Sequence, residues 1–194
     1  MLLFFDTETT GKANFDLPAD HPSQPRLVQI AFQLYTNQGT NPLHSLCCIV
    51  KPDGFTIPDE ATDIHGITTS LALGIGVKPT WILNAFTQLW EKSTVVIAHN
   101  IDFDLMVILN EWSRLGIVRP KEPTTFCTMT ASTNVLKLPG KYNNYKWPKL
   151  SEAYAYFTGK QLENEHDALV DINATKTVYD GLTKLGLTPT KLKT

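Results

Sequence analysis

The order in which strand-like and helix-like patterns follow one another limits the fold of this chain most strongly. Three strand-like segments come first, joined by short, turn-rich stretches that predict an antiparallel meander. Helical and strand-like patterns then alternate, which predicts an α/β fold with a mixed sheet packed against helices. The predicted strands are 1–6, Val28–Tyr35, Ser45–Lys51, 94–98 and 124–128, and the predicted helices are 79–91, 100–116, 150–157 and 167–185.

Length and charge set the broad class. The 194 residues are enough for a sizeable core, and we expect residues 1–194 to form a single domain. The formal net charge is −2, whereas proteins that bind long nucleic acids tightly usually carry an excess of basic residues. Charge therefore gives no support for tight duplex binding, but it is compatible with an enzyme that takes a strand end into an acidic, metal-loaded pocket. The apolar start, MLLFF, is too short for a signal peptide or a membrane span, so we expect a cytoplasmic protein without membrane association.

Two carboxylates stand at the end of the first predicted strand. Asp6 and Glu8 are two residues apart and therefore point to the same side of a strand. Their repulsion calls for a positive partner, and Mg²⁺ or Mn²⁺ is the natural one because hard cations prefer oxygen ligands. The alternative is a solvated, acidic strand end, and the motif alone does not decide between the two.

A second acidic motif, HNIDFD, joins the predicted strand 94–98 to the next helix, with Asn100 as its expected N-cap and Gly116 at its end. Asp102 and Asp104 fall in the first helical turn, where acidic side chains complement the helix dipole. That role is the preferred interpretation for Asp102. For Asp104, a metal-binding role is equally compatible with the pattern.

A third motif, HDALVD, begins the last helix. Asp171 shares a helical face with Ala168, Ala174 and Val178, so we expect it to face the sheet. A carboxylate in such surroundings is costly unless it is paired or bound to metal. His166 precedes the helix, and an imidazole with a pKa of about 6.5 suits proton transfer near neutral pH. The alternative for this histidine is a plain surface residue.

Taken in this order, FDTETTG, HNIDFD and HDALVD resemble the three exonuclease motifs of the DEDDh family, and the likeness spans nearly the whole chain. That family includes proofreading exonucleases, ribonuclease-T-like enzymes and oligoribonucleases. The resemblance implies a ribonuclease-H-like, five-stranded mixed sheet flanked by helices. It also implies a 3′→5′ exonuclease that releases 5′-mononucleotides from single-stranded nucleic acid, with DNA favoured and RNA possible.

The same resemblance implies roles for individual residues. Two divalent ions, Mg²⁺ or Mn²⁺, would be held by four carboxylates, with a histidine as general base; these are Asp6, Glu8, Asp104, Asp171 and His166. Contacts to the terminal nucleotide would come from Thr9, Thr10, Glu60, His65 and Phe103. A helix–turn with a capping role is the alternative for Glu60 and His65, and a core position is the alternative for Phe103. Relatives often carry an Asp-Thr pair where this chain has Cys127 and Thr128.

Two segments have no settled role. Residues 12–26 follow the first motif and either shape access to the site or form an ordinary surface loop, which is the preferred interpretation. Residues 137–149 interleave lysines with Tyr142, Tyr145 and Trp147, a mixture that suits single-strand binding by charge and stacking. The slightly preferred alternative is a loop whose Trp147 anchors into the core while its lysines are merely solvated.

Two rival functions remain at this point. One is a non-catalytic nucleic-acid-binding or scaffold subunit that keeps the fold, but all five key residues of the motifs are present. The other is the proofreading subunit of a larger polymerase assembly. That role would require a polymerase partner, because the chain has no polymerase region.

Overall fold

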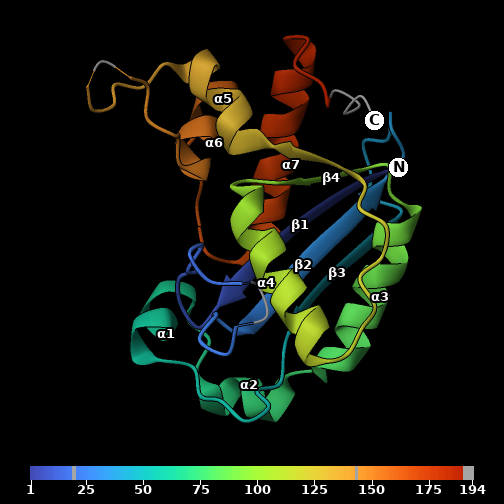
Figure 1. Cartoon of the computed structure of the whole chain (residues 1–194). Helices are drawn as coiled ribbons and strands as arrows, with labels where there is room; N and C mark the ends of the chain where they lie inside the picture. Colours follow the sequence, from blue (N-terminus) through green and yellow to red (C-terminus); the bar gives the residue numbers. More distant parts are fainter. Residues whose placement is uncertain (19–20, 143, 190–194) are drawn as a thin grey trace.

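The computed structural model describes residues 1–18, 21–142 and 144–189. Its elements in chain order are β1 (Leu2–Thr9), β2 (Leu27–Tyr35), β3 (His44–Ile49), α1 (Asp59–His65), α2 (Thr69–Ile75), α3 (Pro79–Lys92), β4 (Val95–Ala98), α4 (Ile101–Arg114), β5 (Thr124–Cys127), α5 (Thr128–Leu136), α6 (Leu150–Thr158) and α7 (Ala168–Lys184). The strands form one sheet in the order β3-β2-β1-β4-β5 (Figure 1). The first three strands pair antiparallel, and β4 and β5 run parallel to β1. The predicted meander and five-stranded mixed sheet are therefore confirmed.

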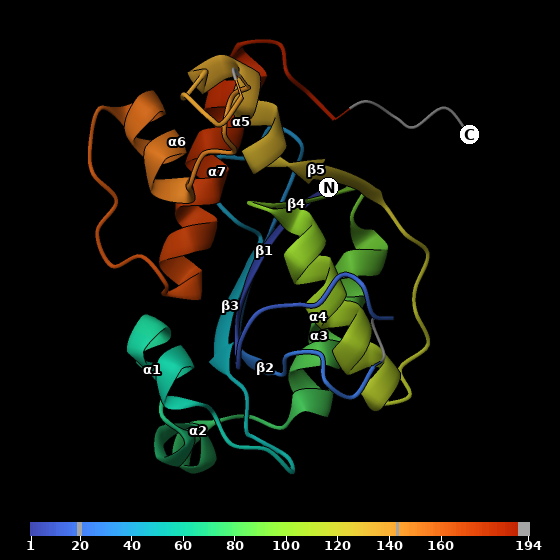
Figure 2. The ribbon, with the colours of Figure 1, turned by 60° about the vertical axis from the view of Figure 1, so that its left-hand side comes forward.

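Helices cover both faces of this sheet. Figure 2 shows α3 and α4 on one face and α7, with α5 and α6 beside it, on the other. Side chains of β1 alternate between the two faces, as the pleat of a strand requires. Leu3 and Phe5 join the main core under α3 and α4, while Leu2 and Phe4 pack with Tyr179 of α7. The same alternation continues to the end of β1, so the polar side chains there point to both faces of the sheet.

Helices α2 and α5 were not predicted, α1 was expected only as the helix–turn alternative for Glu60 and His65, and one predicted cap differs. Helices α1 and α2 have seven residues each, and α5 has nine, so none is long enough to show a clear apolar period. Asn100 does occupy the N-cap position of α4, but it adopts a left-handed conformation (φ 67°) and its side chain makes no capping hydrogen bond. Gly116, at φ 64°, follows the end of α4 as predicted.

The described part of the loop at residues 12–26 packs against α4. The guanidinium group of Arg114 donates hydrogen bonds to the backbone oxygens of Pro22 (3.2 Å) and Gln24 (3.1 Å). The buried side chain of Gln24 in turn donates to the backbone oxygen of Asn14 at 2.7 Å. The loop is thus held in one position next to the second-motif helix.

The segment at residues 137–149 corrects one interpretation. Trp147 is 67% exposed, so the interpretation that it anchors into the core is wrong. The buried residue is its neighbour Pro148, whose backbone oxygen is 3.0 Å from Nε2 of His99. Among the described residues, no helix has both the length and the apolar character that a membrane crossing requires.

Candidate active site

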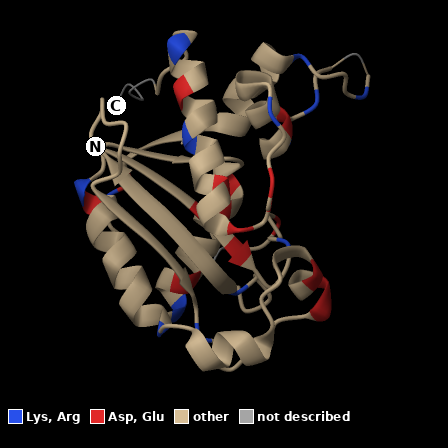
Figure 3. Ribbon diagram, turned by 180° about the vertical axis from the view of Figure 1, so that it is seen from behind, with Lys and Arg blue, Asp and Glu red and all other residues tan. Residues whose placement is uncertain are grey.

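The acidic residues of all three motifs meet at the end of β1. Asp6 and Glu8 lie on the face of the sheet that α7 covers, where Asp171 in the first turn of α7 is buried. Burial raises the pKa of Asp6 well above its ordinary value, and the nearby charges of Asp104, Asp171 and Glu8 raise it further. Figure 3 shows acidic positions gathered around this end of the sheet and the start of α7. Segments nearly the whole chain apart therefore contribute to one acidic cluster.

Asp104 reaches this cluster from the opposite face of the sheet. The pairing of β1 with β4 extends only to Phe4 and Ile97, so the backbone beyond that point is free for other partners. The backbone N–H of Thr7 donates to Oδ1 of Asp104 at 3.0 Å, and the Thr7 hydroxyl donates to the same oxygen at 2.7 Å. Asp102, in contrast, is exposed, as its interpretation as a dipole-complementing residue requires.

The start of α7 is fixed by three hydrogen bonds. The side chain of Asp167 accepts from the backbone N–H groups of Leu169 (2.9 Å) and Val170 (3.2 Å). Gln29, buried on β2, accepts from the backbone N–H of Ala168 at 3.1 Å. The predicted inward face of this helix is confirmed, because Ala168, Asp171, Ala174 and Val178 are all buried. These contacts hold Asp171 against the sheet.

One carboxylate oxygen of Asp171 is left without a partner. Its Oδ2 accepts a hydrogen bond from the backbone N–H of His166 at 3.0 Å, whereas its Oδ1 is buried and has no hydrogen-bond partner. Ligand atoms of Glu8, His166 and Asp171 all lie within 4.8 Å of one another. A buried, unpartnered carboxylate oxygen beside other acids is expensive unless a cation neutralises it.

The raised pKa values of the clustered carboxylates also indicate a cation site. Burial raises the pKa of Glu8 to about 8, helped by the charges of Asp171 and Asp104. Burial raises the pKa of Asp104 to about 7, against the opposing effect of the Thr7 hydrogen bonds. The pKa of Asp171 is raised by burial to about 6. Carboxylates this close repel one another when all of them are ionised. A hard divalent cation such as Mg²⁺ or Mn²⁺, bound by their oxygens, would offset that repulsion.

His166 stands at the rim of this cluster. It is exposed and lies in the loop directly before α7, in the left-handed backbone conformation (φ 70°). Its backbone is tied to Asp171, so its ring stays near the acids while facing solvent. The structure thus brings together all five residues that the motifs predicted.

A pocket adjoins the acids on the α1 side. Its cavity volume is about 460 Å³. The lining residues come from the end of β1, from α1 and from the start of α4, and include Thr9, Thr10, Glu60, His65 and Phe103. All five residues predicted to contact a terminal nucleotide therefore line one pocket. Phe103 is half-buried and also packs on the main core, so it fits both of its interpretations.

His65 offers a hydrogen-bond donor to this pocket. Its Nδ1 accepts from the backbone N–H of Ile67 at 3.1 Å, which leaves the proton of the neutral ring on Nε2. Nε2 is buried and has no hydrogen-bond partner. Burial lowers the pKa of His65 and the proximity of His166 lowers it further, while the backbone of Thr9 beside the ring acts in the opposite direction.

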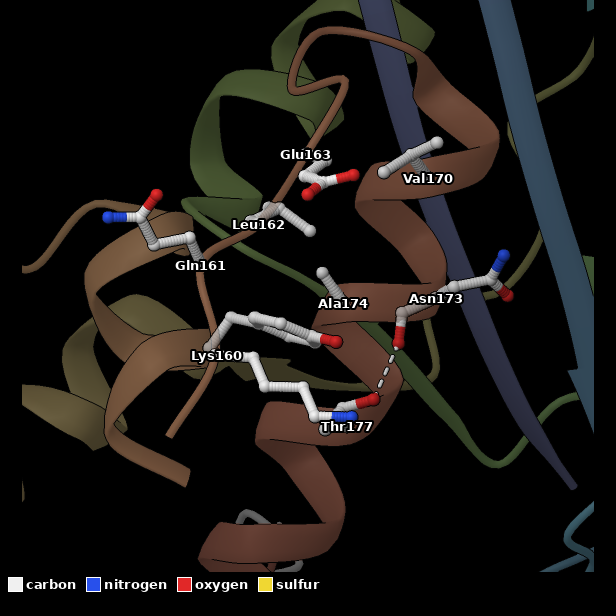
Figure 4. Close-up of a pocket in the computed structure, with 9 residues that line it drawn as sticks. Lys160, Gln161, Leu162, Glu163, Val170, Asn173, Ala174 and Thr177 are labelled. Atoms are coloured by element: carbon white, nitrogen blue, oxygen red, sulfur yellow. Dashed lines mark hydrogen bonds between the residues drawn. The ribbon is translucent and has the colours of Figure 1, made fainter. Parts of the chain in front are cut away.

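A larger cavity lies away from the acidic cluster, between α6, α7 and the segment that joins them. Its volume is about 670 Å³, and Figure 4 shows Lys160, Glu163 and Asn173 around it. Thr177 donates a hydrogen bond to the backbone oxygen of Asn173 at 3.0 Å. None of the five motif residues lines this cavity.

Sequence reasoning missed the residues that hold the acids in place. Thr7, Gln29 and Asp167 each bind a backbone or carboxylate group of the site, and only Asp167, a typical N-cap residue before an apolar helix, carries a sequence signal. Cys127 ends β5 and is half-buried. The residue after it, Thr128, lies 2.9 Å from Nδ1 of His99 through its hydroxyl.

Comparison with known proteins agrees with this geometry. The sequence model of an exonuclease family, RNase_T, matches residues 3–179. An exonuclease of Escherichia phage 186, CP81, is 31% identical over 192 residues, which cover 95% of this chain and 89% of the phage protein. The fold is similar to that of E. coli exonuclease I in complex with a dA16 oligonucleotide, with a TM-score of 0.71 and 22% identity. A complex of the same enzyme with a dT13 oligonucleotide gives the same TM-score and identity. The match to the dA16 complex covers 95% of this chain and 40% of the length of exonuclease I.

Proposed function

Because the chain belongs to the RNase_T exonuclease family, we propose that it releases nucleoside 5′-monophosphates one at a time from the 3′ end of single-stranded nucleic acid, with DNA as the favoured substrate. One observation carries this proposal. The acids of three distant motifs converge beside a pocket of about 460 Å³. Exonuclease I, of similar fold, binds DNA oligonucleotides, which supports the choice of DNA.

The acids of the cluster would hold two divalent metal ions. Asp6, Glu8 and Asp171 would contribute oxygens from the α7 side, and Asp104 from the α4 side. The unpartnered Oδ1 of Asp171 is one atom that such an ion would satisfy. When bound, a pair of such ions lowers the pKa of attacking water and stabilises charge on the entering and leaving oxygens.

His166 is proposed to take the proton of the attacking water. An exposed imidazole next to the acids can accept a proton at the site and pass it to solvent. Its backbone bond to Asp171 limits the positions that the ring can take. This gives the histidine a role that a carboxylate bound to metal cannot fill.

The pocket is proposed to bind the terminal nucleotide. The turn after Glu8 offers the backbone of Thr9 and Thr10, His65 offers its Nε2 proton, and Phe103 offers an aromatic face to a base. Glu60 is exposed at the rim, where a carboxylate suits the 3′ hydroxyl of a strand end.

The test uses labelled single-stranded DNA and RNA with Mg²⁺, with Mn²⁺ and with EDTA. Wild-type protein should degrade the strand with either metal and not with EDTA. Asp6→Ala and His166→Ala should each lower the rate by at least about a hundredfold. Asp102→Ala is the matched control, because this exposed acid lies in the same motif as Asp104. Activity that persists in EDTA, or equal loss in the control, would contradict the proposal.

A further inference from the structure

An exposed surface of lysines and aromatic rings lies outside the site described above. It consists of Lys137, Lys141, Tyr142, Tyr145, Lys146, Trp147 and Lys149, and we refer to it as the lysine–aromatic surface. The exposed fractions of its rings are 93% for Tyr142, 46% for Tyr145 and 67% for Trp147. Three large, exposed rings within one short segment of the chain make it a candidate binding surface.

Charge is distributed unevenly toward this surface. Residues 123–160 contain five lysines and one acid, Glu152, a formal charge of +4 that leaves −6 for the rest of the chain. Lys146 pairs with Glu152 at 2.5 Å, whereas Lys137, Lys141 and Lys149 make no ion pair within the described part of the chain. Figure 3 shows basic positions along this segment. The lysines are therefore available to an anionic ligand.

The surface is anchored close to the acids. The backbone oxygen of Pro148 is bound to His99, the first residue after β4. In the parallel register of β1 and β4, the last pair is Phe4 with Ile97, two residues before Asp6 and His99 respectively. Backbone hydrogen bonds within the described part of the segment run from Gly140 to Asn144 (2.8 Å) and from Lys146 to Leu138 (3.0 Å).

The surface and the nucleotide pocket lie apart from one another. In Figures 1 and 2, α1 lies beside the end of β1, and the segment before α6 lies well away from α1, next to α5 and α6. A strand with its last nucleotide in the α1 pocket and its last phosphodiester at the acids has to leave on the other side. That direction leads toward the lysine–aromatic surface.

We propose that the lysine–aromatic surface binds the single strand upstream of the scissile phosphodiester, with its lysines on phosphates and its rings stacked on bases. This inference rests on the proposed exonuclease function. It adds a second binding region, used only by substrates long enough to reach from the acids to Trp147. Stacking on a ring is tolerant of sequence, so the surface would favour long strands without favouring a particular base.

Tryptophan fluorescence tests binding separately from hydrolysis. Trp90 and Trp112 are buried, which leaves Trp147 and Trp81 of α3 as the exposed tryptophans. In the Trp81→Phe variant, the exposed tryptophan that a ligand can quench is therefore Trp147. In the Trp147→Phe variant, it is Trp81. Titration with phosphorothioate-linked oligothymidylate should quench the first variant and leave the second nearly unchanged. Equal quenching of both, or none in the first, would overturn the proposal.

Substrate length provides the kinetic test. Trp147→Ala with Lys141→Ala should raise KM for a strand of about 20 nucleotides by about tenfold or more, and change KM for a trinucleotide less than about twofold. The dependence of binding on salt should also become less steep, by about 0.7 for each lost phosphate contact. Trp81→Ala with Lys92→Ala, on α3, is the matched control.

The outcomes separate the two proposals. A KM change that is equal for long and short substrates, or absent for both, would overturn the role of the surface while leaving the exonuclease intact. Wild-type protein without any nuclease activity would contradict the proposed function, and the fluorescence titration would still decide whether the surface binds a single strand. Quenching by an unrelated protein but not by oligonucleotide would indicate a protein partner and overturn the inference.

Discussion

Thr7 holds Asp104 with two hydrogen bonds to a single carboxylate oxygen, one from its hydroxyl at 2.7 Å and one from its backbone N–H at 3.0 Å. The two residues are 97 positions apart, and the contact joins the first motif to the second. It lies on the α4 face of the sheet, because Thr7 points away from the face on which Asp6 and Glu8 lie. The position of Asp104 therefore depends on a residue that has no acidic group itself.

Thr7→Val should impair activity more than stability. The valine keeps the shape of the side chain and the backbone donor but removes the hydroxyl, so Asp104 loses one of its two fixed partners. We expect kcat to fall by about tenfold or more, and the free energy of unfolding to fall by about 1 kcal/mol. Thr7→Ser should restore most of the activity, because it restores the donor. Unchanged kcat in Thr7→Val would show that Asp104 needs no such support.

Metal-free protein should lose stability as pH rises from about 5.5 to 8. Glu8 has a pKa of about 8 in the folded protein against an ordinary value of 4.5, so between these values the folded state holds a proton that the unfolded chain has released. Stability therefore falls with rising pH, and the raised pKa values of Asp104 and Asp171 act in the same direction. We expect a Tm lower by roughly 5–10 °C at the higher pH in EDTA, measured by calorimetry.

Glu8→Gln is the control for this pH effect. The substitution removes a group whose pKa is raised to about 8 in the folded protein, so it should raise the Tm of metal-free protein at about pH 8 and flatten the pH profile. Added Mg²⁺ should stabilise wild-type protein at that pH and stabilise the variant less. A variant less stable than wild type in EDTA would contradict the electrostatic account of the cluster.

Glu111→Gln should destabilise the fold. Glu111 is buried in α4, where its carboxylate binds Arg26 at 2.7 Å and Arg114 at 3.0 Å. Removing its charge leaves two partly buried guanidinium groups without their anion, so we expect a loss of about 2–4 kcal/mol in urea denaturation. Glu122→Gln breaks an exposed pair with Arg119 and should cost less than about 0.5 kcal/mol. Equal effects of the two substitutions would contradict this account.

Gly181→Ala should destabilise the contact between α7 and α6. A Cβ atom at position 181 would overlap the ring of Phe157, so one of the two helices would have to shift. We expect a loss of about 1–3 kcal/mol in the free energy of unfolding. Phe157→Leu in the same chain should recover part of this loss by making room for the methyl group. Additive losses in the double variant would argue against a direct clash.

Much of the site could be predicted because strand and helix periods are local. The spacing of Asp6 and Glu8 placed them on one side of β1, and the small residues around Asp171 predicted its inward face. The support that Thr7 gives to Asp104 could not be predicted, because it depends on where the pairing of β1 and β4 stops.

The exposure of the aromatic side chains in the segment before α6 could also not be predicted from the sequence. An aromatic residue such as Trp147 fits a core and a binding surface equally well in sequence, and the structure shows that its neighbour Pro148 is buried while the ring of Trp147 is exposed. The roles of individual residues in metal and substrate binding stay predictions. So does the boundary of the single domain at residues 1–194, since residues 190–194 lie outside the described part of the chain.

The direction of degradation is the most direct measurement of the central claim. A single strand labelled at its 5′ end is incubated with the protein and Mg²⁺, and samples are separated by length over time. The account predicts a ladder that shortens one nucleotide at a time from the 3′ end, with unlabelled nucleoside 5′-monophosphates as the released product. Release of the label in a mononucleotide at the earliest times, or fragments from cuts within the strand, would contradict it.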